Sequence, residues 1–277
     1  MRHGSIGAAI GAACLSGALP ANALELQSHR AVYDLTLSSA EPSTSLVEAS
    51  GRLVLEMSGS SCTGYTVEFR NVTEVNDREG TRRVTDLRSS TRETTSPPQL
   101  VFSHQTLVDQ TLDNEIEGTA TGGAGGISVD ISSPKETTLS LPRAIFPTAH
   151  TRLMLESAEA GERILEATIY DGGDEADSLY ETATVIGDGA TGLPGASADE
   201  RVILAAEDGW MARTAWRLVT SYFEQGGADG ERMPAYELST YMLDNGISYD
   251  VSFNYGSFSM SGKLTSLTLI EVPACPD

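Results

Sequence analysis

Apolar and polar side chains alternate along most of this chain, and a period of two is typical of β-strands that bury one face. In His29–Leu37, Ala31 and Tyr33 share one face while Arg30 and Asp34 share the other. The same alternation predicts further strands over Arg52–Met57, Tyr65–Phe69, Thr81–Arg92, Leu100–Leu107, Thr111–Ala120, Gly126–Ile131, Arg163–Tyr170, Leu179–Ile186, Met211–Glu224, Pro234–Leu243, Ile247–Tyr255 and Ser257–Leu269. The chain is therefore predicted to be mainly β.

Turn signals separate these segments, and Asn245-Gly246 is the strongest, because both residues tolerate a positive φ. One segment departs from the alternation: Thr148 to Ala160 is helix-like, with Thr148 as the expected N-cap and Gly161 as the stop. Met211–Glu224 fits a helix or a strand, and its β-branched and aromatic residues favour a strand. Ala190–Ala198 is predicted to be a loop. We expect one short helix, near residues 148–160.

The amino terminus has the three parts of a secretory signal. Arg2 precedes an uncharged run, Gly4–Leu19, and Ala21-Asn22-Ala23 supplies small residues before a cleavage point. The run is too short and too rich in Gly and Ala for a bilayer span, which needs about 20 strongly apolar residues. We predict cleavage between Ala23 and Leu24, a periplasmic location and no transmembrane anchor after cleavage.

Cysteine usage agrees with export. Cys14 leaves with the signal peptide; lipid attachment at Cys14 is the weaker alternative, because a glycine stands where an apolar residue is usual. Cys62 and Cys275 remain, and an oxidising compartment favours a disulfide between them. Such a bond ties the C-terminus to an early strand. We therefore expect one β-rich domain over residues 24–277.

The charge balance argues against two classes of partner, nucleic acids and anionic membrane surfaces. Asp and Glu total 39 against 18 Lys and Arg, a formal net charge of −21. A surface of this sign repels nucleic-acid phosphates and anionic lipid headgroups. Hydrophobic residues make up 40%, which is enough for a packed core.

A search for catalytic or metal-binding patterns gives no candidate. His29, His104 and His150 are far apart in the sequence, lack metal-ligand spacing, and are interpreted as structural. The acidic run Asp171–Asp177 matches no calcium loop and is predicted to be a solvated hairpin. No serine stands in a nucleophile elbow. We predict no catalytic, cofactor-binding or metal-binding residue and no cofactor.

Several short segments, taken together and in order, carry a family resemblance. They are Ser28–Leu35, Gly51-Arg52-Leu53, Cys62–Tyr65, Leu141-Pro142, Phe146-Pro147-Thr148, Tyr170-Asp171-Gly172, Ser221-Tyr222-Phe223, Asn245-Gly246-Ile247, and Tyr255-Gly256 leading to Cys275. Over nearly the whole mature chain, the sequence resembles the envelope-integrity protein B (EipB-like) family of alphaproteobacterial periplasmic proteins. One departure is local: Met211–Trp216 has no proline where the family would have a Trp-Pro pair, which leaves the start of that strand open.

The resemblance implies a single long antiparallel sheet curled into a spiral or partly open barrel. It also implies a disulfide at the positions of Cys62 and Cys275, a role in maintaining the cell envelope, and no established enzymatic activity. We therefore expect a non-enzymatic periplasmic protein that binds a periplasmic protein or envelope component. A carrier of lipid or lipoprotein acyl chains is the alternative, because a partly open barrel can enclose an apolar groove. A hydrolase acting on envelope polymers is a third hypothesis.

Overall fold

Fourteen strands form one antiparallel sheet, which confirms the predicted mainly β class. The computed structural model describes residues 24–173, 175–225, 232–272 and 275. The strands are β1 (His29–Ala40), β2 (Leu46–Ser60), β3 (Gly64–Asp77), β4 (Arg82–Thr95), β5 (Pro98–Val108), β6 (Thr111–Gly123), β7 (Gly126–Ser133), β8 (Thr137–Leu141), β9 (Ile164–Ile169), β10 (Tyr180–Ile186), β11 (Ala215–Glu224), β12 (Tyr236–Leu243), β13 (Ser248–Asn254) and β14 (Phe258–Leu269).

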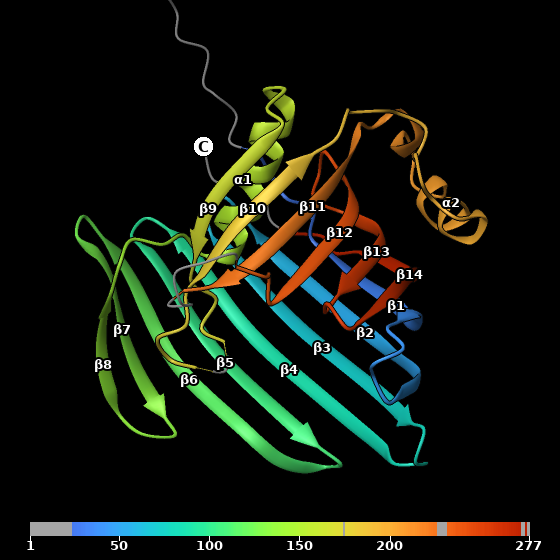
Figure 1. The fold of residues 1–277 in the computed structure, drawn as a ribbon. Helices are drawn as coiled ribbons and strands as arrows, with labels where there is room; N and C mark the ends of the chain where they lie inside the picture. The colour runs from blue at the N-terminus through green and yellow to red at the C-terminus, as the bar shows by residue number, and fades with distance from the viewer. Residues whose placement is uncertain (1–23, 174, 226–231, 273–274, 276–277) are drawn as a thin grey trace, which may run out of the picture.

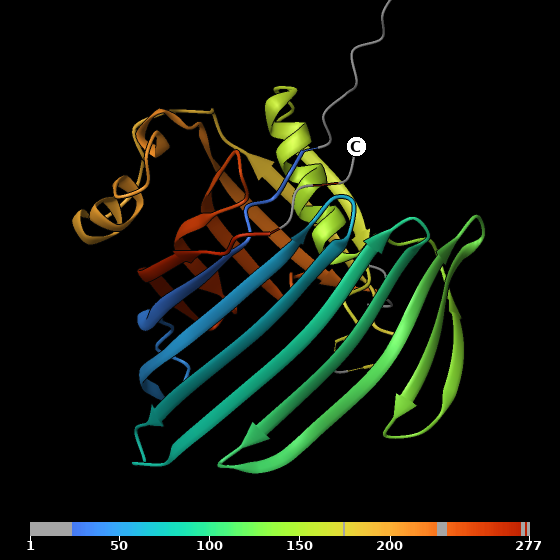
Figure 2. The ribbon, with the colours of Figure 1, turned by 180° about the vertical axis from the view of Figure 1, so that it is seen from behind.

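One pairing between distant segments organises the sheet. The strand order is β8-β7-β6-β5-β4-β3-β2-β1-β14-β13-β12-β11-β10-β9, so β1 pairs with β14 and every other neighbour is consecutive in sequence. The β1–β14 register runs from His29 opposite Leu269 to Ala40 opposite Phe258. β8 and β9 are the two edges, and the sheet does not close. Its long strands β2–β6 form one broad wall, and the shorter strands β9–β14 stand across from it (Figures 1 and 2).

The long strands extend beyond the segments that alternation predicts. The predicted strand Arg52–Met57 is the middle of β2, which runs from Leu46 to Ser60. β8 was not predicted, since Thr137–Leu141 is mostly polar. In both places the conformation is fixed by backbone pairing with a neighbouring strand, and single-sequence periodicity carries no signal for it.

The described residues form two α-helices, one more than predicted. α1 (Pro147–Glu159) agrees with the predicted helix, but its N-cap is Phe146, with Pro147 in the first turn, so Thr148 as N-cap was wrong. Proline suits the first helical position because it lacks the amide hydrogen that would have no partner there. Gly161, with φ of +78°, follows the helix end as expected.

α2 (Ala198–Ala205) corrects the expectation of a single helix. Its first turn is fixed by a capping box, in which the Ser197 side chain accepts from the Glu200 amide and the Glu200 side chain accepts from the Ser197 amide. The predicted strand Met211–Glu224 was wrong at its start. A 3-10 turn occupies Trp210–Ala212, and β11 begins only at Ala215.

Three apolar clusters fill the molecule. The first joins β1, β13 and β14 to α2, through residues such as Tyr33, Leu204 and Leu264. The second lies under β5–β7 and takes in Phe102 and Tyr170. The third packs α1 against β10–β12 and the start of β3, through Tyr65, Met154, Leu155, Ile186, Trp216, Leu218 and Met242. Within the described residues, no helix has the length and apolar character to cross a bilayer.

Candidate binding site: the hollow of the sheet and its disulfide clasp

A disulfide joins the turn after β2 to the C-terminal tail. Cys62 and Cys275 are 213 positions apart in sequence, with their Cα atoms 5.9 Å apart. Ser60 lies against the bond, with its Oγ 3.0 Å from the Cys62 Sγ. This is the pairing that the sequence predicts, and it holds the end of the chain against the β2–β3 turn.

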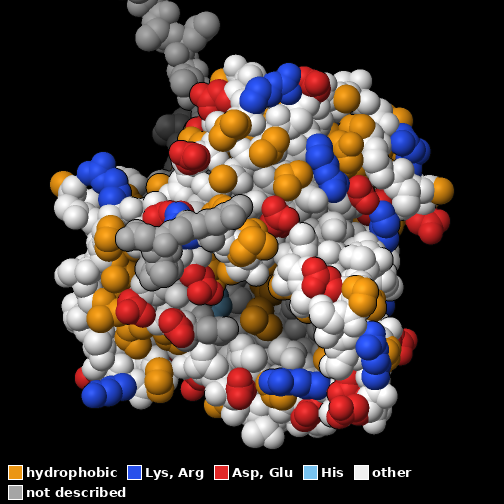
Figure 3. Space-filling view, in the orientation of Figure 1, with side chains coloured by type: hydrophobic (Ala, Val, Ile, Leu, Met, Phe, Trp, Pro, Cys, Tyr) orange, Lys and Arg blue, Asp and Glu red, His pale blue; other side chains and the backbone are white. Residues whose placement is uncertain are grey.

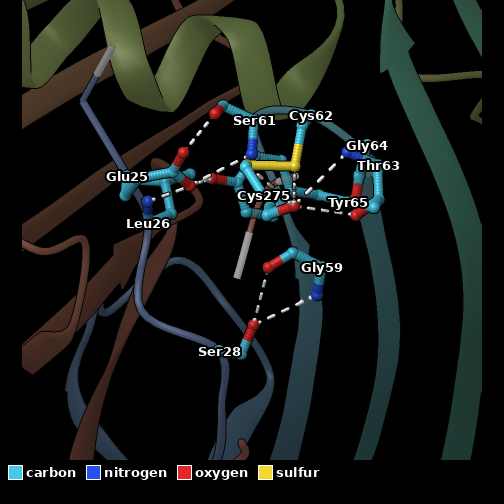
Figure 4. The surroundings of a disulfide bond; sticks show 11 residues. Glu25, Leu26, Ser28, Gly59, Ser61, Cys62, Thr63, Gly64, Tyr65 and Cys275 are labelled. Carbon is cyan, nitrogen blue, oxygen red and sulfur yellow. Dashed lines mark hydrogen bonds between the residues drawn. A yellow bond between two sulfur atoms is a disulfide. The ribbon is translucent and has the colours of Figure 1, made fainter. Parts of the chain in front are cut away.

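The first described residues meet the same turn, and together with the disulfide they form what we call the clasp. The Glu25 carboxylate accepts hydrogen bonds from the Ser61 amide at 3.0 Å and the Tyr65 hydroxyl at 2.8 Å. Ser28 exchanges hydrogen bonds with the Gly59 backbone (Figure 4). Partial burial raises the pKa of Glu25, but the hydrogen bonds from Ser61 and Tyr65 outweigh it and lower the pKa overall.

Across the molecule, aromatic side chains from neighbouring strands form a continuous wall. Tyr222 of β11 and Tyr236 of β12 stack with ring centroids 4.3 Å apart. The contacts continue from Tyr236 to Tyr255 at 6.4 Å, and from Tyr255 to Phe258 of β14 at 4.9 Å. Tyr180 of β10 meets Tyr222 edge-on at 6.1 Å. We call these five residues the aromatic wall.

The aromatic wall lies on the same sheet face as α1. On β11, Tyr222 is separated by even steps from Trp216 and Leu218, which pack against α1. The helix therefore covers one end of this face and the aromatic wall continues beyond it. Burial, and after it the negative charge of Asp171, raises the pKa of Tyr222.

The loop between β9 and β10, residues 170–179, links the aromatic wall to the long strands. Its Tyr170 is fully buried and meets Phe102 of β5 edge-on at 5.9 Å. The His104 Nε2 of β5 lies 3.2 Å from the Asp171 carbonyl oxygen. Gly172 has φ of +74°, and a Cβ there would lie 2.4 Å from the Phe102 ring. The close approach of this loop thus requires glycine.

The facing wall is more polar. The register places Phe69, Ser89 and His104 side by side on one face, and Leu87 beside Thr106 in the next row. The Thr106 hydroxyl is buried and has no hydrogen-bond partner among the described residues. A hollow with hydrophobic side chains inside it opens near the centre of the face in Figure 3, between the ends of β11 and β12 and the long strands β4 and β5.

A second, mostly apolar cavity lies at the start of α1. Pro98, Ile127, Ile145 and Phe146 line it. On its border, the buried Glu93 carboxylate of β4 accepts hydrogen bonds from the Thr148 and Ala149 amides, at 2.7 and 2.8 Å. These amides belong to the first turn of α1, so Glu93 fastens the helix to the long-strand wall.

The histidines singled out in the sequence lie apart. His29 is buried, with Nδ1 2.6 Å from the Gln27 carbonyl, and His150 is buried in α1, with Nε2 3.4 Å from the Thr182 hydroxyl. His104 alone reaches the loop of the hollow. Among the described residues, no three His, Cys, Asp or Glu side chains are grouped so that they could hold a metal ion.

The acidic run Asp171–Asp177 is the connection of the β9–β10 hairpin, as predicted, and its Glu175 and Asp177 are exposed. The prediction missed that the start of this connection turns inward, where Gly172 is buried. Of the predicted cleavage pair, Leu24 is partly buried against the α1 cluster. Ala23 and Cys14 lie outside the described residues, as does the whole predicted signal peptide.

The sequence did not single out the aromatic wall. Its residues come from five strands or strand ends spread from position 180 to 258, and nothing in one sequence gives the register that aligns them. One sequence feature could have indicated the aromatic wall: Tyr222, Tyr236 and Tyr255 each stand near the end of a strand.

Comparisons with known proteins agree with this architecture. A family model described as EipB-like matches residues 20–271. A protein named cell envelope integrity protein EipB, from Brucella abortus (strain 2308), is 36% identical over 252 residues, which cover 91% of this chain and 87% of that protein. A crystal structure of a beta-barrel-like protein of a domain of unknown function, also from Brucella abortus, superposes with a TM-score of 0.83 at 35% identity, covering 90% of this chain and 100% of that one.

Proposed function

Because this chain belongs to the EipB-like family, we propose that it supports the integrity of the cell envelope as a non-enzymatic periplasmic protein. It acts by binding a periplasmic protein or an envelope component. The observation that carries the proposal is the hollow between the aromatic wall and the polar wall of the open sheet. Concave sites that combine apolar surface with a few polar groups are the usual form of ligand sites.

Two features favour a more specific candidate, a carrier of lipid or lipoprotein acyl chains. The aromatic wall offers stacked, partly buried rings, and the cavity at the start of α1 is mostly apolar. Apolar chains would be removed from water against such surfaces, at roughly 25 cal/mol for each Å² buried.

Native mass spectrometry after gentle purification tests the carrier hypothesis. We expect an added lipid mass on the wild-type protein, reduced in Tyr222→Ser/Tyr236→Ser. Met233→Ser is the control, because Met233 is exposed and outside the aromatic wall. If neither the wild type nor the variants carry lipid, the carrier hypothesis is contradicted, whereas the partner-binding hypothesis is unaffected.

The envelope role is tested by deleting the gene and measuring sensitivity to detergents and envelope antibiotics. We expect increased sensitivity, restored by the wild-type gene and restored poorly by Tyr222→Ser/Tyr236→Ser. Unchanged sensitivity of the deletion strain contradicts the proposal.

Location is tested on the exported protein itself. Mass spectrometry of the periplasmic fraction should give a mature chain that begins at Leu24, and Ala23→Asp should prevent cleavage, because the site needs a small residue. A full-length protein that still carries residues 1–23 in the cytoplasm contradicts the predicted export.

A further inference from the structure

The two edges of the sheet differ in how they are protected. An edge strand exposes unpaired amide and carbonyl groups, and proteins block such edges with short strands, prolines or charged residues. β8 has these features: it spans only Thr137–Leu141, follows Pro134 and Lys135, and ends before Pro142. β9, Ile164–Ile169, is also short and carries Glu166, but unlike β8 it is not flanked by prolines. Figure 1 shows β8 and β9 at opposite ends of the sheet.

The free hydrogen-bonding groups of β9 can be assigned. The Thr168 carbonyl accepts from the Ile145 amide, and the Tyr170 amide donates to the Ile145 carbonyl, so even-numbered residues face away from β10. Successive residues of a strand alternate in this respect. The backbone groups of Ile164 and Glu166 and the Thr168 amide thus face the free edge, where the described part of the chain provides no partner.

The side chains along this edge are exposed, and they are apolar at Ile164 and acidic at Glu166. On the face opposite α1, Ile164 is 66% exposed and pairs with Val185 of β10, which is 57% exposed. Val185 in turn pairs with Val219 of β11, so an apolar row ends abruptly at the edge. Glu166 lies on the same face and is exposed. It lines a pocket together with Arg232, whose guanidinium is paired with Glu181. Arg163, the nearest cation to Glu166 in sequence, is paired with Asp188.

We propose that β9 is a docking edge for an extended segment of a partner protein, which adds antiparallel to Ile164–Thr168 as a further strand. The backbone groups of the edge supply the hydrogen bonds, as in other cases of strand addition. An apolar side chain lies opposite Ile164 and continues the apolar row. A basic side chain lies opposite Glu166, because opposite charges are favoured in directly facing cross-strand pairs.

The bridge between Ile145 and Ile169 shows that this edge can pair with another strand, and it also sets where the partner segment must end. Ile145 already forms an isolated parallel bridge with Ile169, so the edge geometry accepts a strand there. The chain then leaves β9, since Arg143 reaches the Ala124 carbonyl in the β6–β7 turn. The partner segment therefore ends near Thr168. The proposal rests on the proposed function in one respect, that the protein acts by binding a partner.

Binding of a short, capped synthetic peptide tests the docking edge. Its core is Thr-Val-Lys-Val-Val, which places lysine opposite Glu166 and valine opposite Ile164 in antiparallel register. Glu166→Pro removes the outward amide without breaking the β9–β10 ladder, and Glu166→Gln keeps the amide but removes the charge. We expect at least about tenfold weaker binding to the proline variant, with the glutamine variant between it and the wild type.

Two further readouts separate strand addition from simple charge attraction to an acidic protein. The same peptide with N-methylated amides on its pairing edge should not bind, and the unmodified peptide should slow hydrogen exchange at the amides of Ile164, Glu166 and Thr168. Equal affinity for the proline and glutamine variants, or for the methylated peptide, overturns the proposal. So does self-association that Glu166→Pro abolishes, because a second copy would then be the occupant. These assays measure binding alone, so they can fail while the envelope role stands.

Discussion

Glu200 is a charged side chain with no exposed surface, and it joins three elements. One carboxylate oxygen accepts from the Asp250 amide at 3.0 Å and the Leu264 amide at 3.1 Å, which fixes α2 to β13 and β14. The other accepts from the amide and hydroxyl of Ser197 in the capping box. A buried charge persists only where its hydrogen bonds are satisfied in this way.

Replacing Glu200 by Gln should destabilise the protein by about 2–3 kcal/mol, because an amide cannot accept from donors on both sides. Urea unfolding measures the loss. Asp199→Asn is the matched control: it removes the same charge from the same helical turn, but Asp199 is exposed, and the expected change is below about 0.5 kcal/mol. Equal losses for the two variants would show that charge alone, and not the buried contacts, decides the effect.

His150 gives the stability a defined pH dependence. Burial lowers its pKa from 6.5 to about 4. The folded state binds the proton less tightly than the unfolded chain does. The free energy of unfolding therefore has its full value above about pH 6.5 and decreases as the pH falls towards about 4, because His150 is then protonated in the unfolded chain.

The free energies of unfolding of the wild type and of His150→Gln should therefore differ most at neutral pH and approach each other as the pH falls. A shift of this size corresponds to at most about 3 kcal/mol. Equal slopes of unfolding free energy against pH, between pH 6.5 and 4, would contradict the assignment to His150.

At the scale of elements, the sequence predicts those that it marks by alternation or by signals at their ends. The middle of β2 has alternating side chains, and α1 begins at Pro147 and ends shortly before Gly161. α2 was missed although Ser197 and Glu200 form a recognisable capping box, because Gly192 and Pro194 directly before them suggested a continuing loop. The register of one strand against the next depends on the whole sheet, which is why the aromatic wall was not predicted.

The docking of α1 depends on Glu93 of β4, which accepts from two first-turn amides. Glu93→Gln retains one acceptor and turns a donor towards the second amide. We expect a loss of about 1–2 kcal/mol and faster hydrogen exchange at Thr148 and Ala149. Glu162→Gln, an exposed change just beyond the other end of α1, is the control. Unchanged exchange in Glu93→Gln would mean that packing alone holds the helix.

The whole molecule is held together at two places. β1 pairs with β14, and the clasp bonds Cys275 to the turn between β2 and β3, so the first and last strands lie in the middle of the sheet and not at its edges. The edges β8 and β9 are left to define the opening. The pairing of the two cysteines can be predicted from the sequence. The hollow cannot, because it forms only where strands that are distant in the sequence meet.

Loss of the disulfide should therefore destabilise the middle of the sheet, where the tail is bonded to the β2–β3 turn. The bond encloses 213 positions, and in the chain-entropy model a loop of this length contributes about 5 kcal/mol at most. Cys62→Ser and Cys275→Ser should each lower the melting temperature and the resistance to proteases by similar amounts. The circular dichroism spectrum should remain that of a β protein, because every strand pairing of the sheet can persist without the bond.

The double variant Cys62→Ser/Cys275→Ser supplies the internal control. Since either substitution removes the same bond, the double variant should be no less stable than the single ones, and reductant should change the wild type alone. Independent losses that add in the double variant would mean that the serines disturb packing at the clasp. A wild-type melting temperature that is the same with and without reductant would show that the β1–β14 pairing is sufficient, and that the disulfide is dispensable for stability.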